Sequence, residues 1–292
     1  LDRPASADEI IEEFAQTCRQ YRLKLFADVV LGRVASDAYL AKSRPHWFHG
    51  ADRADRRVDP RSSVPQLHAA YANFDEPAIA SEIAGWWIER LLRLARAGVA
   101  GFRCPEPQLV PSGIWRDVIA AVEQSFPDCR FVAWTPGLDW KDLAGLRSIG
   151  FAGCFSSLPW WDGRASWFVE EHGILRGIGS VIACPEAPFG PRLARRFADA
   201  VNLPTIYRHN LRCAAATGDG LMVPMGFEFA ASEDMDPRLL NGDNFSAAEV
   251  GGNLDFANEI QAANALSEQL TKLGACGEMR TLTGPEQPVT VL

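Results

Sequence analysis

Apolar positions follow two alternating patterns along this chain. Short, nearly continuous apolar runs alternate with longer segments in which apolar residues recur every three or four positions. The first pattern is typical of parallel strands covered on both faces, and the second is typical of amphipathic helices. The short apolar runs predict six strands, at residues 23–31, 99–104, 129–134, 151–157, 180–184 and 220–223.

The helical pattern predicts seven helices between and around these strands. They are expected at residues 8–22, 76–97, 112–126, 140–149, 167–177, 203–217 and 254–273. Ser6 with Glu9 three positions later forms a capping-box pattern at the start of the first helix. The apolar positions of that helix are expected to form a buried stripe: Ile10, Ile11, Phe14, Cys18 and Tyr21.

The alternation of strands and helices predicts an α/β fold of the (β/α)8 TIM-barrel type. Only six of the eight required units are visible, so the barrel is expected to be truncated at its N-terminal side, with two units upstream of Leu1. A doubly wound open sheet is the alternative, and it needs no missing piece. Residues 1–275 are assigned to the barrel and residues 276–292 to the start of a following β element.

The apolar periodicity disappears between the first two strands. Residues 32–75 are therefore interpreted as an inserted loop subdomain. The insertion contains Arg44-Pro45-His46-Trp47-Phe48-His49, followed by the charged run at 52–57. Its aromatic and basic residues could stack on a ligand. Alternatively, Trp47 and Phe48 anchor the insertion to the barrel.

The composition limits the classes of partner. A net charge of -8 argues against nucleic acid and anionic membranes, which both attract positive surfaces. The sequence shows no transmembrane run and no signal-peptide pattern, so a cytoplasmic protein is expected. The seven cysteines form no C-x-x-C pair, and no strand is followed by G-x-G-x-x-G. We therefore expect reduced cysteines, no metal site and no cofactor.

Polar and aromatic residues gather at the ends of the predicted strands. In a parallel α/β barrel, the carboxyl ends of the strands face the ligand. Arg103 and Glu106 therefore lie where chemistry or sugar binding is expected. A structural ion pair is the alternative for Arg103 and Glu106, and His172 is expected at the surface or at a helix end.

Several phrases resemble the α-amylase clan of glycoside hydrolases, and within it the maltosyl-transferring enzymes that extend α-1,4-glucan from maltose 1-phosphate. Leu25-Phe26-Ala27-Asp28-Val29-Val30 resembles the first conserved block of the clan, and Gly101-Phe102-Arg103-Cys104-Pro105 resembles the second. The segment from Arg44 to His49 resembles an insertion of the maltosyltransferases, and residues 220–228 resemble the last strand of the clan's barrel.

The resemblance implies a retaining mechanism in which one carboxylate attacks the anomeric carbon and another protonates the leaving group. The position that matches the nucleophile is Pro105, and the acid is expected near Ala133 or Trp134. Glu186 could match a third acid of the family, so the resemblance implies Glu106 and Glu186 as the candidate catalytic carboxylates. It also implies a sugar-binding cleft with six substrate-binding residues: Asp28, Arg33, Arg103, Trp134, Trp160 and Trp161. Because general-acid help contributes roughly 10²–10⁴-fold in rate, a barrel without both groups should not cleave glycosidic bonds efficiently.

Three hypotheses follow for the function. The first is an inactive amylase-type barrel of glycogen and α-glucan metabolism that binds α-1,4-glucan or maltosyl groups, including maltose 1-phosphate, within a longer maltosyltransferase chain. The second is an active maltosyltransferase or glycosidase that uses displaced carboxylates. The third is a structural domain that docks a catalytic domain of the same polypeptide.

Overall fold

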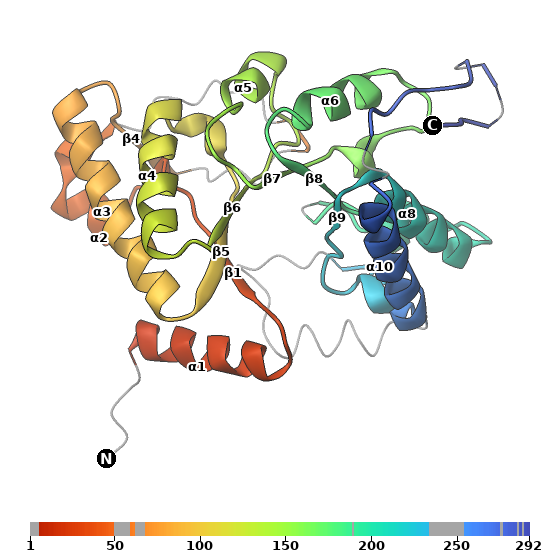
Figure 1. Ribbon diagram of the computed structural model, residues 1–292, viewed down its shortest axis with the longest axis horizontal. Helices are drawn as coiled ribbons and strands as arrows, with labels where there is room; N and C mark the ends of the chain where they lie inside the picture. The colour runs from red at the N-terminus through yellow and green to blue at the C-terminus, as the bar shows by residue number, and fades with distance from the viewer. Residues whose placement is uncertain are drawn as a thin grey trace. The chain divides into compact units, whose positions relative to one another are not determined.

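The computed structural model describes residues 6–49, 59–61, 68–188, 190–233, 254–274, 277–284, 286–287 and 289–292, and the fold is α/β (Figure 1). Six strands form one sheet in the order β1-β5-β6-β7-β8-β9. Their bounds are β1 (Leu25–Asp28), β5 (Val99–Cys104), β6 (Arg130–Ala133), β7 (Gly153–Phe155), β8 (Ser180–Ala183) and β9 (Gly220–Leu221). Each predicted strand is present, and most are shorter than expected.

The order of the strands distinguishes the two predicted folds. The six strands follow one another across the sheet in the order in which they occur along the chain. The pairs β1–β5, β5–β6 and β8–β9 are parallel. A doubly wound sheet reverses its strand order at a switch point, whereas a barrel does not. The barrel-type fold predicted from the sequence is therefore confirmed, with six of its strands present.

All seven predicted helices are present. They are α1 (Ala7–Gln20), α3 (Pro77–Arg96), α4 (Ser112–Ser125), α5 (Trp140–Gly145), α6 (Trp167–Leu175), α8 (Leu203–Thr217) and α10 (Ala257–Lys272). The apolar pattern does not predict the short α7 (Leu193–Arg196) or the 3-10 turns η2 (Pro107–Leu109), η3 (Leu158–Trp160) and η4 (Phe227–Phe229). One turn of helix is too short to produce a recognisable period.

The chain divides into two compact units within the predicted barrel. The first unit comprises residues 1–58 and 65–153, and the second comprises residues 59–64 and 154–292. In the first unit, Phe102 of β5 and Phe131 of β6 are fully buried, with ring centroids 5.2 Å apart. In the second unit, Tyr207 stacks on Phe256 at 4.9 Å and contacts Phe227. Each unit therefore has its own aromatic core.

The insertion at residues 32–75 contains a small antiparallel sheet. Strands β2 (Arg33–Ala35), β4 (Ala69–Ala72) and β3 (Phe48–His49) pair in the order β2-β4-β3, together with α2 (Tyr39–Ser43) and η1 (Pro45–Trp47). These strands are too short to show alternation in the sequence. Trp47 is 1% exposed and donates a hydrogen bond of 2.9 Å from Nε1 to Glu82. This contact supports the anchoring role, while the charged run at 52–57 lies outside the described residues.

One of the two predictions for helix α1, the buried apolar stripe, differs from the structure. Its capping box forms, because Ser6 and Glu9 exchange hydrogen bonds. The predicted buried stripe is only partly buried: Ile10 is 56% exposed, Phe14 55% and Tyr21 73%. Helical periodicity identifies an apolar face, but it does not show what covers that face.

The C-terminal residues form no strand in their described part. Residues 276–292 were predicted to begin a β element, and in their described part Leu282 donates one backbone hydrogen bond of 2.8 Å to Val291. Within the part of the chain that the structure describes, no helix is long and apolar enough to cross a membrane.

Candidate functional site

Asp28 and Arg103 form an ion pair at the carboxyl ends of two neighbouring strands. They are register partners in β1 and β5. Arg103 donates from Nε to Oδ1 of Asp28 at 2.7 Å and from Nη2 to Oδ2 at 2.6 Å. A two-point contact of this kind fixes both side chains in direction as well as in distance. Asp28, a carboxylate within a predicted strand, is therefore paired.

Trp134 lies directly after β6, beside this ion pair. The guanidinium carbon of Arg103 lies 6.0 Å from the centroid of the Trp134 ring, at the limit for a cation–π contact. The ring is 1% exposed, so other parts of the protein cover it. In this structure, Trp134 supports Arg103 and presents no open face on which a sugar could stack.

Glu106 pairs with Arg33, not with Arg103. Glu106 directly precedes η2, and its carboxylate accepts a hydrogen bond from Nε of Arg33 in β2. The two side chains are only 16% and 10% exposed. The insertion therefore supplies the partner of a candidate catalytic carboxylate. Instead of the structural ion pair considered for Arg103 and Glu106, Arg103 pairs with Asp28 and Glu106 pairs with Arg33.

Cys104, between Arg103 and Pro105, is fully buried. Burial raises the pKa of its thiol well above the usual range, and the negative charge of Asp28 acts in the same direction. A thiolate is therefore disfavoured despite the neighbouring arginine. Cys104 fills space at the end of β5, and its buried thiol is poorly placed to act as a nucleophile.

Glu186 lies in the second unit, just after β8, and is held by two groups. One carboxylate oxygen lies 2.7 Å from Nη2 of Arg192, and the other accepts a hydrogen bond of 2.9 Å from the backbone N–H of Leu193. Arg192 also donates to the carbonyl of Met225 at 3.0 Å. Burial raises the pKa of Glu186, while the charge of Arg192 opposes that rise. With 1% of each residue exposed, this pair joins α7 to the end of β8.

Trp160 and Trp161 are half-buried at the end of η3 in the second unit. Trp161 stacks on Phe168 of α6, with ring centroids 4.6 Å apart and an interplanar angle of 21°. Its Nε1–H donates to the carbonyl of Ala165 at 2.8 Å. These contacts fix the orientation of the indole while part of it stays accessible. Of the three predicted tryptophans, Trp160 and Trp161 have accessible surface for a ligand.

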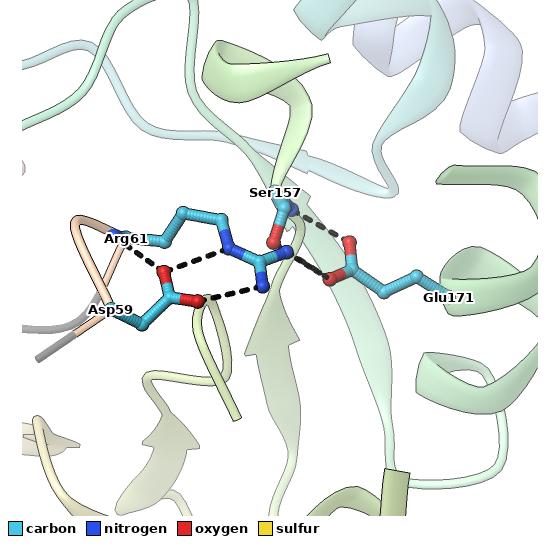
Figure 2. A network of polar contacts seen from close by, with 4 residues as sticks. All are labelled: Asp59, Arg61, Ser157 and Glu171. Carbon is cyan, nitrogen blue, oxygen red and sulfur yellow. Dashed lines mark hydrogen bonds and ion pairs between the residues drawn. The ribbon is translucent and has the colours of Figure 1, made fainter. Parts of the chain in front are cut away.

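A network that the sequence analysis missed surrounds Glu171 of α6 (Figure 2). Glu171 is 4% exposed and accepts hydrogen bonds from the Ser157 backbone N–H at 2.9 Å and from the Ser157 hydroxyl at 2.6 Å. Nη1 of Arg61 lies 4.0 Å from the same carboxylate, and Arg61 also forms a two-point contact of 2.9 Å with Asp59. Burial raises the pKa of Glu171, and the Ser157 bonds oppose this effect.

The guanidinium of Arg61 also lies 5.6 Å from the ring centroid of Trp167. All of these residues belong to the second unit, although Asp59 and Arg61 come from the insertion. No short motif marks the network in the sequence, because its members are about a hundred positions apart. The one feature of the local sequence that could have indicated the network is Glu171 followed directly by His172. His172 was expected at the surface or at a helix end. It lies in the last turn of α6, but it is not at the surface, because it is 4% exposed and contacts the Thr217 carbonyl at 3.2 Å.

A cavity of about 280 Å³ lies in the first unit, beside η2. It is lined by Phe74 and Asp75, by the turn at residues 107–112, and by Asp142 and Leu146 near α5. None of the predicted site residues is among its lining residues. Among the described residues, no group of three or more histidine, cysteine, aspartate or glutamate side chains is arranged to hold a metal ion.

Comparisons with known proteins relate the chain to maltosyltransferases. No family model matches. The chain is 37% identical over 300 residues to an α-1,4-glucan:maltose-1-phosphate maltosyltransferase from Burkholderia pseudomallei, a match that covers 100% of the chain and 26% of that protein. A protein of the same description from Bifidobacterium longum is 28% identical over 159 residues, covering 51% of the chain and 20% of its own length. The chain thus spans about a quarter of these relatives.

Solved structures with the same fold are amylases and related hydrolases. An α-amylase from Lactobacillus plantarum matches 88% of the chain and 62% of its own chain, with a TM-score of 0.64 and 18% identity. A Geobacillus thermoleovorans α-amylase complexed with acarbose gives a TM-score of 0.64 at 14% identity, over 94% of this chain and 63% of its own. The fold therefore matches amylase-type barrels over most of the chain.

Proposed function

From the premise that this chain is a relative of the α-amylase family, related to maltosyltransferases, we propose that it is a glucan-binding barrel without catalytic activity of its own. It acts in α-glucan metabolism as one part of a longer polypeptide whose maltosyl transfer takes place elsewhere. Its ligands are α-1,4-glucan chains or the maltosyl group of maltose 1-phosphate.

The main observation in support of lost catalysis is that each candidate carboxylate forms an ion pair with an arginine. Glu106 is paired with Arg33, and Glu186 is paired with Arg192. A nucleophilic carboxylate must approach the anomeric carbon, and a general acid must deliver a proton to the leaving oxygen. Glu186, at 1% exposure, can reach neither atom without opening the core. Pro105 at the matching nucleophile position supports the same conclusion.

Trp160 and Trp161 support the binding function. Protein surfaces that recognise sugars combine aromatic faces with a few polar groups. Trp161 is held by its stack on Phe168 and by its hydrogen bond to Ala165, so little conformational entropy is lost when a ligand binds. We assign the glucan-binding surface to these two tryptophans.

Six cysteines of the described residues support a cytoplasmic location for this function. They are thiols in the structure: Cys18, Cys104, Cys129, Cys154, Cys184 and Cys213. Burial raises the pKa of Cys154 to about 12. Thiols of this kind persist in a reducing compartment, where disulfides are rare.

Calorimetry with maltoheptaose and with maltose 1-phosphate tests the proposal. We expect binding to at least one ligand, weakened about tenfold or more by Trp160→Ala, which corresponds to about 1.4 kcal/mol. Trp140→Ala is the matched control, because Trp140 is a tryptophan of α5 that is 48% exposed. We expect that control to leave affinity unchanged.

Two results would contradict the proposal in different ways. If neither ligand binds, the structural hypothesis replaces the binding hypothesis. If the chain releases phosphate from maltose 1-phosphate and Glu106→Gln abolishes the release, the barrel is an enzyme with displaced carboxylates.

A further inference from the structure

Residues 157–165 carry both tryptophans of the proposed glucan-binding surface, and we call them the tryptophan loop. Contacts within the loop stabilise its second half, where Oδ1 of Asp162 accepts hydrogen bonds of 2.8 Å from the backbone N–H groups of Arg164 and Ala165. Asp162 is exposed, so these bonds lie at the surface. The first residue of the loop, Ser157, is fully buried and is held from outside the loop.

Glu171 of α6 holds this first residue. One of its carboxylate oxygens accepts from the backbone N–H of Ser157 at 2.9 Å, and the other accepts from the Ser157 hydroxyl at 2.6 Å (Figure 2). Hydrogen bonds to a carboxylate are short and strong, and two of them to one residue fix its orientation. The carbonyl of Ser157 in turn accepts a hydrogen bond of 3.0 Å from the backbone N–H of Trp160. Glu171 therefore orients the turn that carries Trp160.

Helix α6 supports the second tryptophan as well. Trp161 stacks on Phe168, which lies three positions before Glu171 in the helix. Residues three or four positions apart are neighbours on a helix surface, so one side of α6 contacts both parts of the loop. Glu171 is 4% exposed, and a buried carboxylate costs free energy unless hydrogen bonds and an opposite charge compensate it. An apolar residue could fill this space without that cost, but it could not orient Ser157.

Arg61, which belongs to the insertion in sequence, supplies the opposite charge. Its Nη1 lies 4.0 Å from the Glu171 carboxylate, and its guanidinium carbon lies 5.6 Å from the ring centroid of Trp167, four positions earlier in α6. Asp59 fixes the guanidinium through two hydrogen bonds of 2.9 Å. Burial raises the pKa of Glu171, and the charge of Arg61 opposes this rise. Arg61 therefore favours the ionised carboxylate, in which both oxygens accept hydrogen bonds from Ser157.

We propose that Glu171 is a positioning residue of the glucan-binding surface: it orients the tryptophan loop through Ser157, and Arg61 supports it in that role. In this arrangement neither Glu171 nor Arg61 touches the ligand. The inference rests on the proposed function, because it explains how Trp160 and Trp161 are held in place before a ligand arrives. A surface that is already in its binding orientation loses less conformational entropy on binding.

Variants at Ser157 and Glu171 test the proposal by calorimetry with maltoheptaose and with maltose 1-phosphate. Ser157→Ala removes the hydroxyl and should weaken the affinity about fivefold, the effect of one lost hydrogen bond. Glu171→Met removes both bonds and should weaken it further. The conservative Glu171→Gln should recover part of that loss, because its amide can accept from the Ser157 N–H and donate to the hydroxyl.

A fluorine NMR spectrum separates positioning from a general loss of stability. The nine tryptophans are replaced by 5-fluorotryptophan, and Trp160→Phe identifies the Trp160 signal. Leu211→Ala is the control, because Leu211 is 1% exposed in α8 and its loss should destabilise the same unit without changing the affinity. We expect Ser157→Ala to shift the Trp160 signal and Leu211→Ala to leave it in place.

A double-mutant cycle tests the contribution of Arg61. Arg61→Met should weaken binding about threefold in the parent protein, because Glu171 loses the charge that favours its ionised form. The same change should have no effect in the Glu171→Gln background, where no carboxylate needs that charge.

Each contrary result would overturn the proposal for a different reason. Unchanged affinity and an unchanged Trp160 signal in Ser157→Ala would show that the contact does not orient the loop. An equal effect of Arg61→Met in both backgrounds would show that Arg61 acts on the ligand directly. Equal losses of affinity in Leu211→Ala and Ser157→Ala would show that affinity follows stability alone. If the parent protein binds neither ligand, the proposed function itself fails, and a shifted Trp160 signal then assigns Glu171 a structural role only.

Discussion

Glu186 and Arg192 form an ion pair inside the second unit, with 2.7 Å between a carboxylate oxygen and Nη2. Their side chains are 1% and 2% exposed. A buried pair of this kind brings little net stability compared with apolar residues, but loss of one partner leaves an uncompensated buried charge. The pair therefore holds α7 against the turn at Met225.

Loss of one member of this pair should destabilise the protein strongly. We expect Arg192→Met to lower the free energy of unfolding by about 3–5 kcal/mol, because Glu186 would stay buried without its partner. Urea denaturation measures the change. Lys272→Met is the control, since Lys272 pairs with Glu268 at an exposed position of α10 and its loss should have a much smaller effect. Equal effects of the two variants would mean that Glu186 gains access to water.

Glu171 should make stability depend on pH. Burial raises its pKa above the ordinary value of 4.5, so the folded state binds this proton more tightly than the unfolded state. Its favourable contribution is therefore fully present below pH 4.5 and is lost as the pH rises through the raised value. Glu171→Gln removes this titration, so the variant should gain stability relative to the parent protein as the pH rises.

Urea denaturation at about pH 4 and about pH 8 measures this difference. Glu170→Gln, at an exposed neighbouring position of α6, is the control. If the stability of Glu171→Gln relative to the parent falls with rising pH, the hydrogen bonds from Ser157 and the charge of Arg61 outweigh burial.

Gly101 should tolerate no side chain. A Cβ at this position of β5 would lie 2.3 Å from the Phe26 ring and 2.6 Å from the carbonyl oxygen of Arg130. We expect Gly101→Ala to destabilise the protein by about 1–3 kcal/mol through overpacking. Gly85→Ala is the control, because nothing lies within 4 Å of a Cβ there and alanine favours helix α3 by about 1 kcal/mol. Thermal unfolding should move the two variants in opposite directions.

A nucleophile placed at position 105 should not restore turnover. Pro105→Asp puts a carboxylate two residues after Arg103, where the resemblance expects the nucleophile. We expect no phosphate release from maltose 1-phosphate, because Ala133 and Trp134 offer no acid at the end of β6 and are 0% and 1% exposed. A phosphate assay measures the result, with Pro105→Asn as the uncharged control. Release by the aspartate variant alone would show that another group supplies the proton.

Periodicity located the strands and helices of the barrel well. Residues 99–104 and 203–217 have the predicted bounds of β5 and α8, because each is long enough to show its period and is closed by clear breakers. The small sheet of the insertion was missed, since β3 contains only Phe48 and His49. Strands of two to four residues form there through pairing partners that are distant in sequence, and no local pattern records those partners.

The sequence by itself determined the alternation of strands and helices, the positions of polar residues at strand ends, and the proline at position 105. These depend on local spacing and identity, which are visible along one chain. Only the tertiary structure decided the partners: Asp28 with Arg103, Glu106 with Arg33, and Glu186 with Arg192. It also decided that Trp134 is buried and that Ile10 and Phe14 of α1 are exposed. Charge pairing and burial depend on groups that are distant in sequence and meet only when the chain folds.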